Sequence, residues 1–141
     1  MICISRCPYR ISLLGGGSDL GWFVDQEGYG ISLGYSLSKY SYTVVNKLPK
    51  NSSRGILNYS SREEYFDPDE IAHPLIRSAL KYFSVSDPIE MSSFGFASRG
   101  SGLGGSSSFL ISLLCSLAAT KDKYLDSSEL AEIASNIEIN W

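Results

Sequence analysis

The sequence has little histidine and little excess charge of either sign. Its 141 residues include one histidine, His73, and the 12 basic and 15 acidic residues leave a net charge of −3. The sequence pI near 5.1 gives no general electrostatic attraction to nucleic acid or to an anionic membrane. We therefore expect neither of these partners, and an anionic ligand would need a local binding site.

Paired cysteines and long apolar runs are also missing. Cys3, Cys7 and Cys115 form no metal-ligand pattern, and their odd number favours free, buried thiols in a reducing compartment. No basic segment followed by an apolar one marks a signal peptide. The longest apolar run, residues 109–119, is interrupted by serine and is shorter than the roughly 20 residues that span a bilayer. These absences predict a cytoplasmic protein.

The distribution of strand-forming and helix-forming segments predicts an α+β domain. Strands are expected at residues 2–14, 31–48, 56–59 and 89–96, and helices at residues 74–83, 106–119 and from 127 onward. Ser127, Ser128 and Glu129 resemble the start of the last helix. That helix still continues at Trp141 without a capping residue, so we expect a chain that is cut off.

A glycine- and serine-rich loop joins the last predicted strand to the apolar helix. It reads Gly100-Ser101-Gly102-Leu103-Gly104-Gly105-Ser106-Ser107-Ser108. Glycines permit positive φ, so that successive N–H groups can surround an anion at a helix N-terminus. Serine hydroxyls can contact phosphate or Mg²⁺. The loop therefore indicates phosphate binding, although it has neither the Walker lysine nor a dinucleotide fingerprint. The alternative is a flexible loop that ends in an ordinary serine N-cap.

A second glycine-rich bend follows the first predicted strand. The segment P-Y-R-I-S-L-L-G-G-G-S-D-L carries Arg10 before three glycines and Asp19 after them. Arg10 offers a permanent charge with five donors, and Asp19 offers acceptors for sugar hydroxyls. The alternative for this pair is a surface arginine and an aspartate in an Asx-turn.

The two motifs together resemble the N-terminal half of a GHMP kinase, in the correct order. The G-G-G-S-D-L form, H-P-L-I-R-S-A-L-K-Y-F and S-S-E-L-A-E-I-A-x-x-I-E are most similar to the D-glycero-D-manno-heptose 7-phosphate kinase branch. The resemblance implies that residues 1–141 form the two-layer N-terminal ATP-binding domain of this fold, without its C-terminal domain. It departs from the family at Ser98-Arg99, where a proline is usual before the loop.

The resemblance also assigns the site residues. Arg10 matches the basic residue at the catalytic centre, and Gly17, Ser18 and Asp19 match the sugar-binding bend. Glu138 matches a Mg²⁺ ligand, although a helix-surface glutamate is the alternative, and Ser106 matches the other ligand, with Ser107 left open for this role. The ATP phosphates would be bound by Gly100, Ser101, Gly102, Leu103, Gly104, Gly105, Ser106 and Ser107.

The function implied is Mg²⁺- and ATP-dependent phosphorylation of the anomeric hydroxyl of a heptose 7-phosphate. The family's catalytic aspartate follows the glutamate matched by Glu138 and is not in this chain, so we expect the chain alone to be inactive. The alternatives are another sugar 1-kinase similar to fucokinase or galactokinase, a non-catalytic nucleotide-binding module, and an interaction domain whose glycine loops are only turns.

Overall fold

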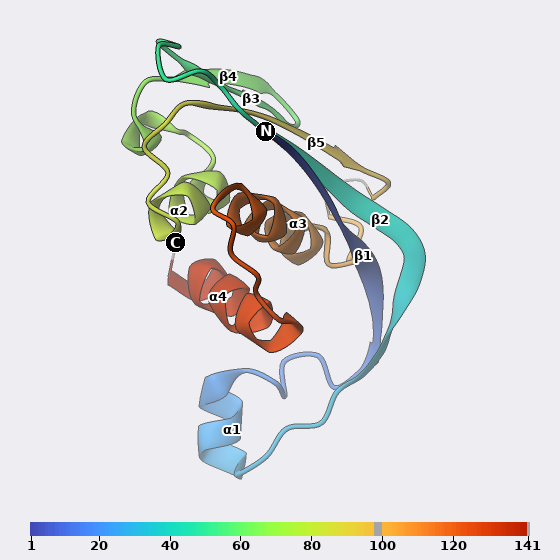
Figure 1. Cartoon of the computed structure of the whole chain (residues 1–141). Helices are drawn as coiled ribbons and strands as arrows, with labels where there is room; N and C mark the ends of the chain where they lie inside the picture. Colours follow the sequence, from blue (N-terminus) through green and yellow to red (C-terminus); the bar gives the residue numbers. More distant parts are fainter. Residues whose placement is uncertain (98–99, 141) are drawn as a thin grey trace.

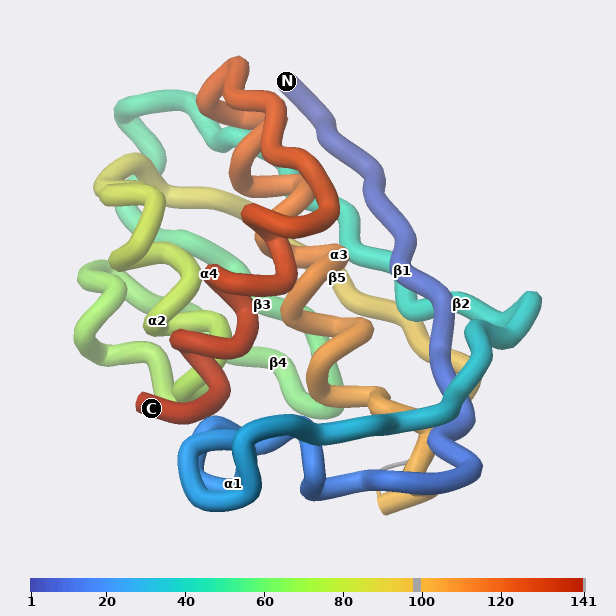
Figure 2. Tube along the Cα trace, turned by 90° about the horizontal axis from the view of Figure 1, so that it is seen from below, coloured from blue at the N-terminus to red at the C-terminus, as the bar shows by residue number. Residues whose placement is uncertain are grey.

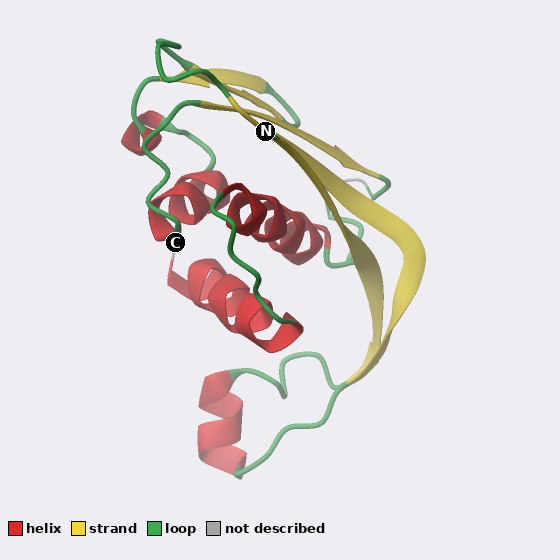
Figure 3. Ribbon diagram, in the orientation of Figure 1, coloured by secondary structure: helices red, strands yellow, loops and turns green. Residues whose placement is uncertain are grey.

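The computed structural model describes residues 1–97 and 100–140, so Ser98, Arg99 and Trp141 lie outside the described residues. A single five-stranded sheet has three helices packed over one face (Figures 1 and 3). The strands are β1 (Ile2–Leu14), β2 (Leu33–Lys47), β3 (Gly55–Asn58), β4 (Arg62–Tyr65) and β5 (Ile89–Gly95). The helices are α1 (Gly21–Glu27), α2 (Pro74–Tyr82), α3 (Gly105–Thr120) and α4 (Ser127–Asn140), with the short 3-10 helix η1 (Pro68–Glu70). This architecture confirms the α+β prediction.

The sheet has the order β1-β2-β5-β3-β4, and its strands are antiparallel except for the pair β3 and β5. The ladder between β1 and β2 shifts its register between Pro8 and Arg10. Such an irregularity bends a strand and re-aims the side chains beside it. Arg10 thus lies where β1 changes its course next to the glycine loop.

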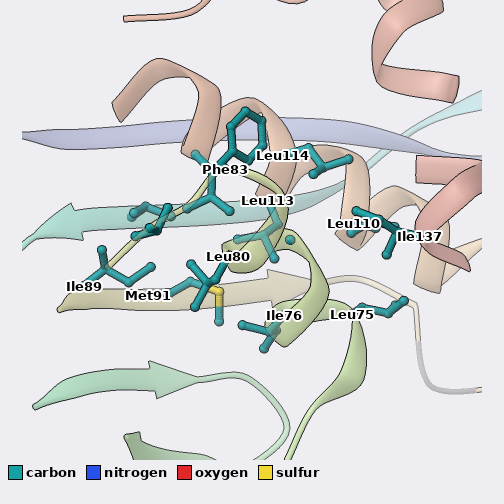
Figure 4. Packing of buried hydrophobic residues seen from close by; sticks show 14 of the residues in the cluster. Leu75, Ile76, Leu80, Phe83, Ile89, Met91, Leu110, Leu113, Leu114 and Ile137 are labelled. Atoms are coloured by element: carbon teal, nitrogen blue, oxygen red, sulfur yellow. The ribbon is translucent and has the colours of Figure 1, made fainter. Parts of the chain in front are cut away.

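The hydrophobic core lies between the sheet and the helices (Figure 4). Alternation along β5 buries Ile89 and Met91, and helical spacing brings Ile76 and Leu80 of α2 onto them. Helix α3 contributes the largest group of fully buried leucines, namely Leu110, Leu113, Leu114 and Leu117. Helix α4 packs on α3 and α2 and covers the core through Ile133, Ala134 and Ile137. The helix that follows the glycine loop is therefore held in the centre of the domain.

A stripe of serines on α3 faces the sheet and bonds to it. Ser112 Oγ lies 2.8 Å from Thr43 Oγ1 of β2, and Ser116 Oγ donates to the carbonyl of Thr43 at 3.2 Å. Ser5 of β1 bonds the carbonyl of Ser112 and lies 2.8 Å from Ser116 Oγ. One turn earlier, Ser108 Oγ donates to the carbonyl of Pro8 at 2.9 Å. Serines four residues apart share one helix face, so this stripe fixes α3 against β1 and β2.

The segment between β1 and β2 projects from the domain as an arm, defined here as residues 13–35. Helix α1 buries none of its residues and stands apart from α2, α3 and α4 (Figures 1 and 2). The two sides of the arm cross closely, because a Cβ on Gly30 would lie 1.6 Å from the carbonyl oxygen of Ser18, and one on Gly15 would lie 1.9 Å from that of Ile31. Ser18 Oγ lies 2.7 Å from the same Ile31 carbonyl.

Most predicted elements agree with the structure within a few residues. Three elements were not predicted: α1, which is too short to show a period, the short 3-10 helix η1, and the charged strand β4. Helix α4 is capped by Asp126 rather than by the serines, since Asp126 Oδ1 accepts the N–H groups of Ser128 and Glu129 at 2.8 and 2.9 Å. The three cysteines are free, but half-buried instead of buried. Within the described ranges, no helix is long and apolar enough to cross a bilayer.

Candidate active site

The glycine loop forms an open turn that leads into the N-terminus of α3. Gly100, Gly102 and Gly104 have φ of 80°, 73° and 70°, the left-handed region that favours glycine. Apart from each glycine's own chain neighbours, no atom of the described residues lies within 4 Å of a Cβ placed on Gly100 or Gly102, so this side of the loop is open toward the described part of the chain. Gly104 is the N-cap of α3 and supplies no side-chain bond to its first N–H groups. An uncapped helix N-terminus beside such a loop can bind an anion.

Strand β1 holds this loop in place through Arg10. The N–H of Arg10 donates to the carbonyl of Leu103 at 3.1 Å, and its Nη1 donates to that of Gly102 at 3.0 Å. A Cβ on Gly104 would lie 3.2 Å from the Arg10 side chain, so the guanidinium group packs directly on the loop. The structure thus brings Arg10 and the predicted phosphate loop together. Arg10 is exposed, and its charge adds to the positive end of α3.

The three serines at the start of α3 have different surroundings. Ser106 is exposed, and Ser108 is buried with its hydroxyl bonded to Pro8. Ser107 donates its hydroxyl to the carboxylate of Glu138 on α4, with Oγ 3.1 and 3.0 Å from the two carboxylate oxygens. Glu138 is half-buried, and its role as a Mg²⁺ ligand stays a prediction. Ser107, which was left open as a ligand, is the serine that contacts Glu138.

The predicted sugar-binding residues lie in the arm. Asp19 Oδ1 accepts the N–H of Gly17, two residues earlier in the chain, at 3.0 Å. This bond closes the bend but is not an Asx-turn, in which the donor lies two residues after the aspartate. Ser18 ties the two sides of the arm through Gly15 and Ile31. Their described hydrogen bonds remain within the arm, whereas Arg10 bonds the loop. Asp19 is exposed, so its second carboxylate oxygen is accessible to a ligand.

The residues present fit a magnesium-bound triphosphate. Glu138 supplies a carboxylate and Ser106 and Ser107 supply hydroxyls, which are oxygen donors that Mg²⁺ prefers. Within the described part of the chain, no group of three or more histidine, cysteine, aspartate or glutamate side chains could hold a metal ion. Mg²⁺ usually keeps several waters and is bound by one or two carboxylates together with phosphates, and a single carboxylate with two nearby hydroxyls is compatible with this mode of binding.

Sequence reasoning missed two residues that shape the loop. Tyr9 is buried. A Cβ on Gly95 would lie 2.4 Å from the Tyr9 hydroxyl oxygen, so the glycine at the end of β5 leaves room for the tyrosine side chain. Pro8 accepts the bond from Ser108. The structure buries alternate residues of β1 and so places Tyr9 on the face that carries the helices. The sequence gives no clear signal for this, because the apolar residues Ile2 and Ile4 lie on the exposed face.

One family model and several solved structures are similar to this chain. Residues 72–140 match the GHMP kinases N terminal domain. A D-glycero-D-manno-heptose 1-phosphate kinase from Bacteriodes thetaiotaomicron superposes on 99% of this chain with a TM-score of 0.86 and 23% identity, over 48% of its own chain. Lactococcus lactis galactokinase, solved with galactose, superposes on 97% with a TM-score of 0.75 and 17% identity, over 37% of its own chain.

Methanococcus jannaschii mevalonate kinase superposes on 98% of the chain with a TM-score of 0.73 and 16% identity, over 46% of its own chain. The chain thus spans about half the length of the solved structures that it matches, or less. No curated protein sequence matches it. Residues 72–140 thus match the GHMP kinases N terminal domain, and the chain shares its fold with these solved kinases.

Proposed function

We propose that this chain is the ATP-binding part of a sugar kinase. The observation that carries the proposal is the loop of three left-handed glycines that ends at the uncapped N-terminus of the central helix α3. Backbone N–H groups and the helix dipole are suited to the β- and γ-phosphates of ATP. The same loop is bonded to the cationic side chain of Arg10 and lies beside Glu138, through Ser107.

Each residue of the site has a role in this proposal. Residues 100–107 hold the triphosphate, and Glu138 with Ser106 or Ser107 holds Mg²⁺, which when bound neutralises phosphate charge. Arg10 keeps the loop in shape and places a permanent positive charge where negative charge develops during phosphoryl transfer. Because phosphoryl transfer depends mainly on positioning and electrostatics, a rigid loop on a buried helix suits the reaction.

The acceptor is proposed to be a sugar phosphate held by the arm. Asp19 offers a carboxylate, and Gly17 and Ser18 shape the bend that carries it. We infer the anomeric hydroxyl of a heptose 7-phosphate as the first candidate for the reacting group, supported by the G-G-G-S-D-L motif and by the heptose phosphate kinase among the similar folds. The galactokinase among them makes galactose the second candidate to assay.

We further propose that residues 1–141 are the N-terminal domain of a longer kinase, whose remaining part supplies the base that takes the proton of the sugar hydroxyl. The length of the matched structures supports this proposal, since the chain covers less than half of each. The base must lie within hydrogen-bond reach of the acceptor hydroxyl.

Calorimetric titration of the chain with MgATP tests the binding step. Binding is expected, and Gly102→Ala should weaken it about tenfold, because a side chain is strained at the left-handed φ of 73° and enters the free side of the loop. Gly28→Ala is the matched control, since Gly28 has φ of 82° and an equally open environment at the end of α1. Absence of MgATP binding, or equal loss in both variants, would contradict the proposal.

The kinase step needs the whole polypeptide that the gene encodes. Phosphorylation of heptose 7-phosphate is expected to exceed that of galactose and fucose, measured by release of ADP and by mass of the product. Nucleotide binding without transfer to any of these sugars would instead identify a non-catalytic nucleotide-binding module.

A further inference from the structure

A hollow of about 360 Å³ lies on the face of the sheet that no described helix covers (Figures 1 and 3). It is lined by four aromatic side chains from β2 and from the end of β5, namely Tyr40, Tyr42, Phe94 and Phe96. Alternation along β2 buries Ser41 and Thr43 on the side of α3, so the two tyrosines point to the opposite side. None of the described residues that line the hollow belongs to the candidate active site.

The aromatic rings of the hollow form a row across two strands. Tyr42 and Phe94 are partners in the antiparallel ladder between β2 and β5, where opposite Cβ atoms lie about 4.5–5.5 Å apart. Tyr40 adjoins Tyr42, with the ring centroids 6.1 Å apart. Phe94 is 60% exposed and Phe96 is 63% exposed, so much of each ring is accessible. Neighbouring exposed rings are a platform on which a flat aromatic ligand can stack.

Two cations border this platform. Lys39 Nζ lies 4.9 Å from the centroid of the Phe96 ring, and Arg6 Cζ lies 4.4 Å from that of the Tyr40 ring. The ion pairs of the described residues include neither cation. Arg6 covers the ring of Tyr40 and holds it in place, whereas Lys39 is exposed beside Phe96. The rings of Tyr42 and Phe94 therefore lie next to positive charge.

The surrounding segments carry no acidic residue that would offset these charges. Residues 1–18, 28–62 and 91–121 contain no aspartate or glutamate. Glu90 is the nearest acid along β5, and the four residues from it to Phe94 span about 13 Å of strand. Although the whole chain has a net charge of −3, this part of the sheet is cationic. The ligand that suits it is flat, aromatic and anionic.

We propose that the hollow binds a nucleoside monophosphate, with its base stacked on Tyr42 and Phe94 and its phosphate at the Lys39 ammonium group. A volume of about 360 Å³ is at the small end of the range for ligand pockets, which suits one nucleotide rather than a chain of several. Stacking tolerates every base, because each has a π-face, so a purine and a pyrimidine should both bind. This site is separate from the glycine loop, and its occupation does not require the chain to be a kinase.

Titration of the isotope-labelled 141-residue chain with AMP, followed by NMR, tests the proposal. The ring signals of Tyr42 and Phe94 should shift and saturate, because a stacked base changes the magnetic environment of both rings. The amide signals of Gly102 and Gly104 report occupation of the glycine loop, so the two sites are read separately. UMP should shift the same ring signals, whereas inorganic phosphate alone should leave them in place.

Two variants separate stacking from charge. Phe94→Leu should weaken AMP binding at the hollow at least about fivefold, because leucine keeps apolar volume but removes a stacking face. Lys39→Gln should weaken AMP binding about two- to fivefold and leave the binding of uncharged adenosine the same. Phe66→Leu is the matched control, since Phe66 is 62% exposed and has Arg54 Cζ 4.7 Å from its ring centroid, but does not line the hollow. Unchanged amide signals from α3 show that each variant is folded.

Several results would overturn the proposal. These are ring signals that stay in place at about 10 mM AMP, shifts confined to the glycine loop, and equal loss of binding in Phe94→Leu and Phe66→Leu. Ring signals that shift with protein concentration alone, together with dimers in sedimentation velocity, would overturn it and identify a second copy on this face. Binding of a single-stranded oligonucleotide without binding of AMP or UMP would reject it in favour of a longer nucleic acid.

Discussion

At the scale of single residues, Arg10 determines the shape of the glycine loop. Its guanidinium group and its backbone N–H bond two successive loop carbonyls, and its side chain packs on Gly104. The sequence indicated a cation near a glycine bend, and the structure adds that this cation contacts the other glycine motif, 90 residues further along the chain. Only the bend in β1, which no sequence period reveals, brings the two together.

Arg10→Lys is expected to weaken MgATP binding about five- to tenfold, because an ammonium group cannot reproduce the planar guanidinium contact with the loop. The free energy of unfolding should change little, since Arg10 is exposed. Calorimetry and urea denaturation measure the two effects. Arg6→Lys is the control on the same strand, where Arg6 stacks on Tyr40 at 4.4 Å. Equal loss of binding in both variants would contradict the role of Arg10.

Glu138→Gln is expected to lower the Mg²⁺-dependent part of ATP affinity about tenfold, because glutamine keeps an acceptor for the Ser107 hydroxyl but loses the charge that attracts the cation. Affinity measured in EDTA should remain the same. The comparison is Glu132→Gln, an exposed glutamate on the same helix. Titration of each variant with and without Mg²⁺ decides whether Glu138 is a ligand, and an unchanged Mg²⁺ response would exclude it.

Two half-buried thiols should react slowly with alkylating reagents. Burial raises the pKa of Cys7 above the usual thiol range, and neighbouring Cys115 raises it further; burial also raises the pKa of Cys115. The thiolate is the reactive form, so a raised pKa leaves less of it at pH 8 than in free cysteine. Iodoacetamide labelling, followed by mass spectrometry, should be slower than that of glutathione and still accelerate above pH 9. A plateau below pH 8 would contradict this expectation.

At the scale of elements, the arm depends on two glycines rather than on packing. Gly30→Ala is expected to open the arm, because the new methyl group would meet the Ser18 carbonyl oxygen. Limited proteolysis should then cut within residues 13–35 at least about tenfold faster, while the urea midpoint of the core changes little. Gly21→Ala is the control, since nothing lies within 4 Å of its Cβ position. Unchanged proteolysis of Gly30→Ala would show that the crossing can relax.

The elements differ in how far the sequence predicts them. Helices α2 and α3 were predicted because their apolar residues repeat at helical spacing, and β1 because a β-prone run ends at three glycines. Strand β4 was missed because Arg62, Glu63 and Glu64 show no apolar alternation. These residues form a strand because they pair with β3. The side chains of Arg54 and Arg62 both form ion pairs with Glu64. These two cations hold the pKa of the Glu64 carboxyl below its usual range.

The sequence indicated candidate residues of the site but not which of them contact one another. Composition indicated phosphate binding for Gly100 to Ser107, with a flexible loop as the alternative, and this role stays a prediction. The contact between Ser107 and Glu138 could not be predicted, because it depends on how α4 packs across α3. Nor could the sequence decide which of Ser106 and Ser107 contacts Glu138, because this depends on the rotation of α3 about its own axis.

At the scale of the whole molecule, the 141-residue chain is expected to bind MgATP but to phosphorylate heptose 7-phosphate at no more than the uncatalysed rate. The electrostatic part of the site is present, whereas no base for the acceptor hydroxyl has been assigned within it. A coupled assay of ADP release over several hours measures this, with glucose and a commercial hexokinase as the positive control. Turnover by the chain alone would place the base among its own residues.

The serine stripe of α3 has a mechanical consequence for this domain. Ser108, Ser112 and Ser116 attach the helix to β1 and β2 at three successive turns, so sliding by one residue or rotating by a fraction of a turn would break several bonds at once. We therefore expect α3 not to shift along its axis relative to the sheet. The loop bonded to Arg10 should thus be presented to a ligand from a helix that stays in place.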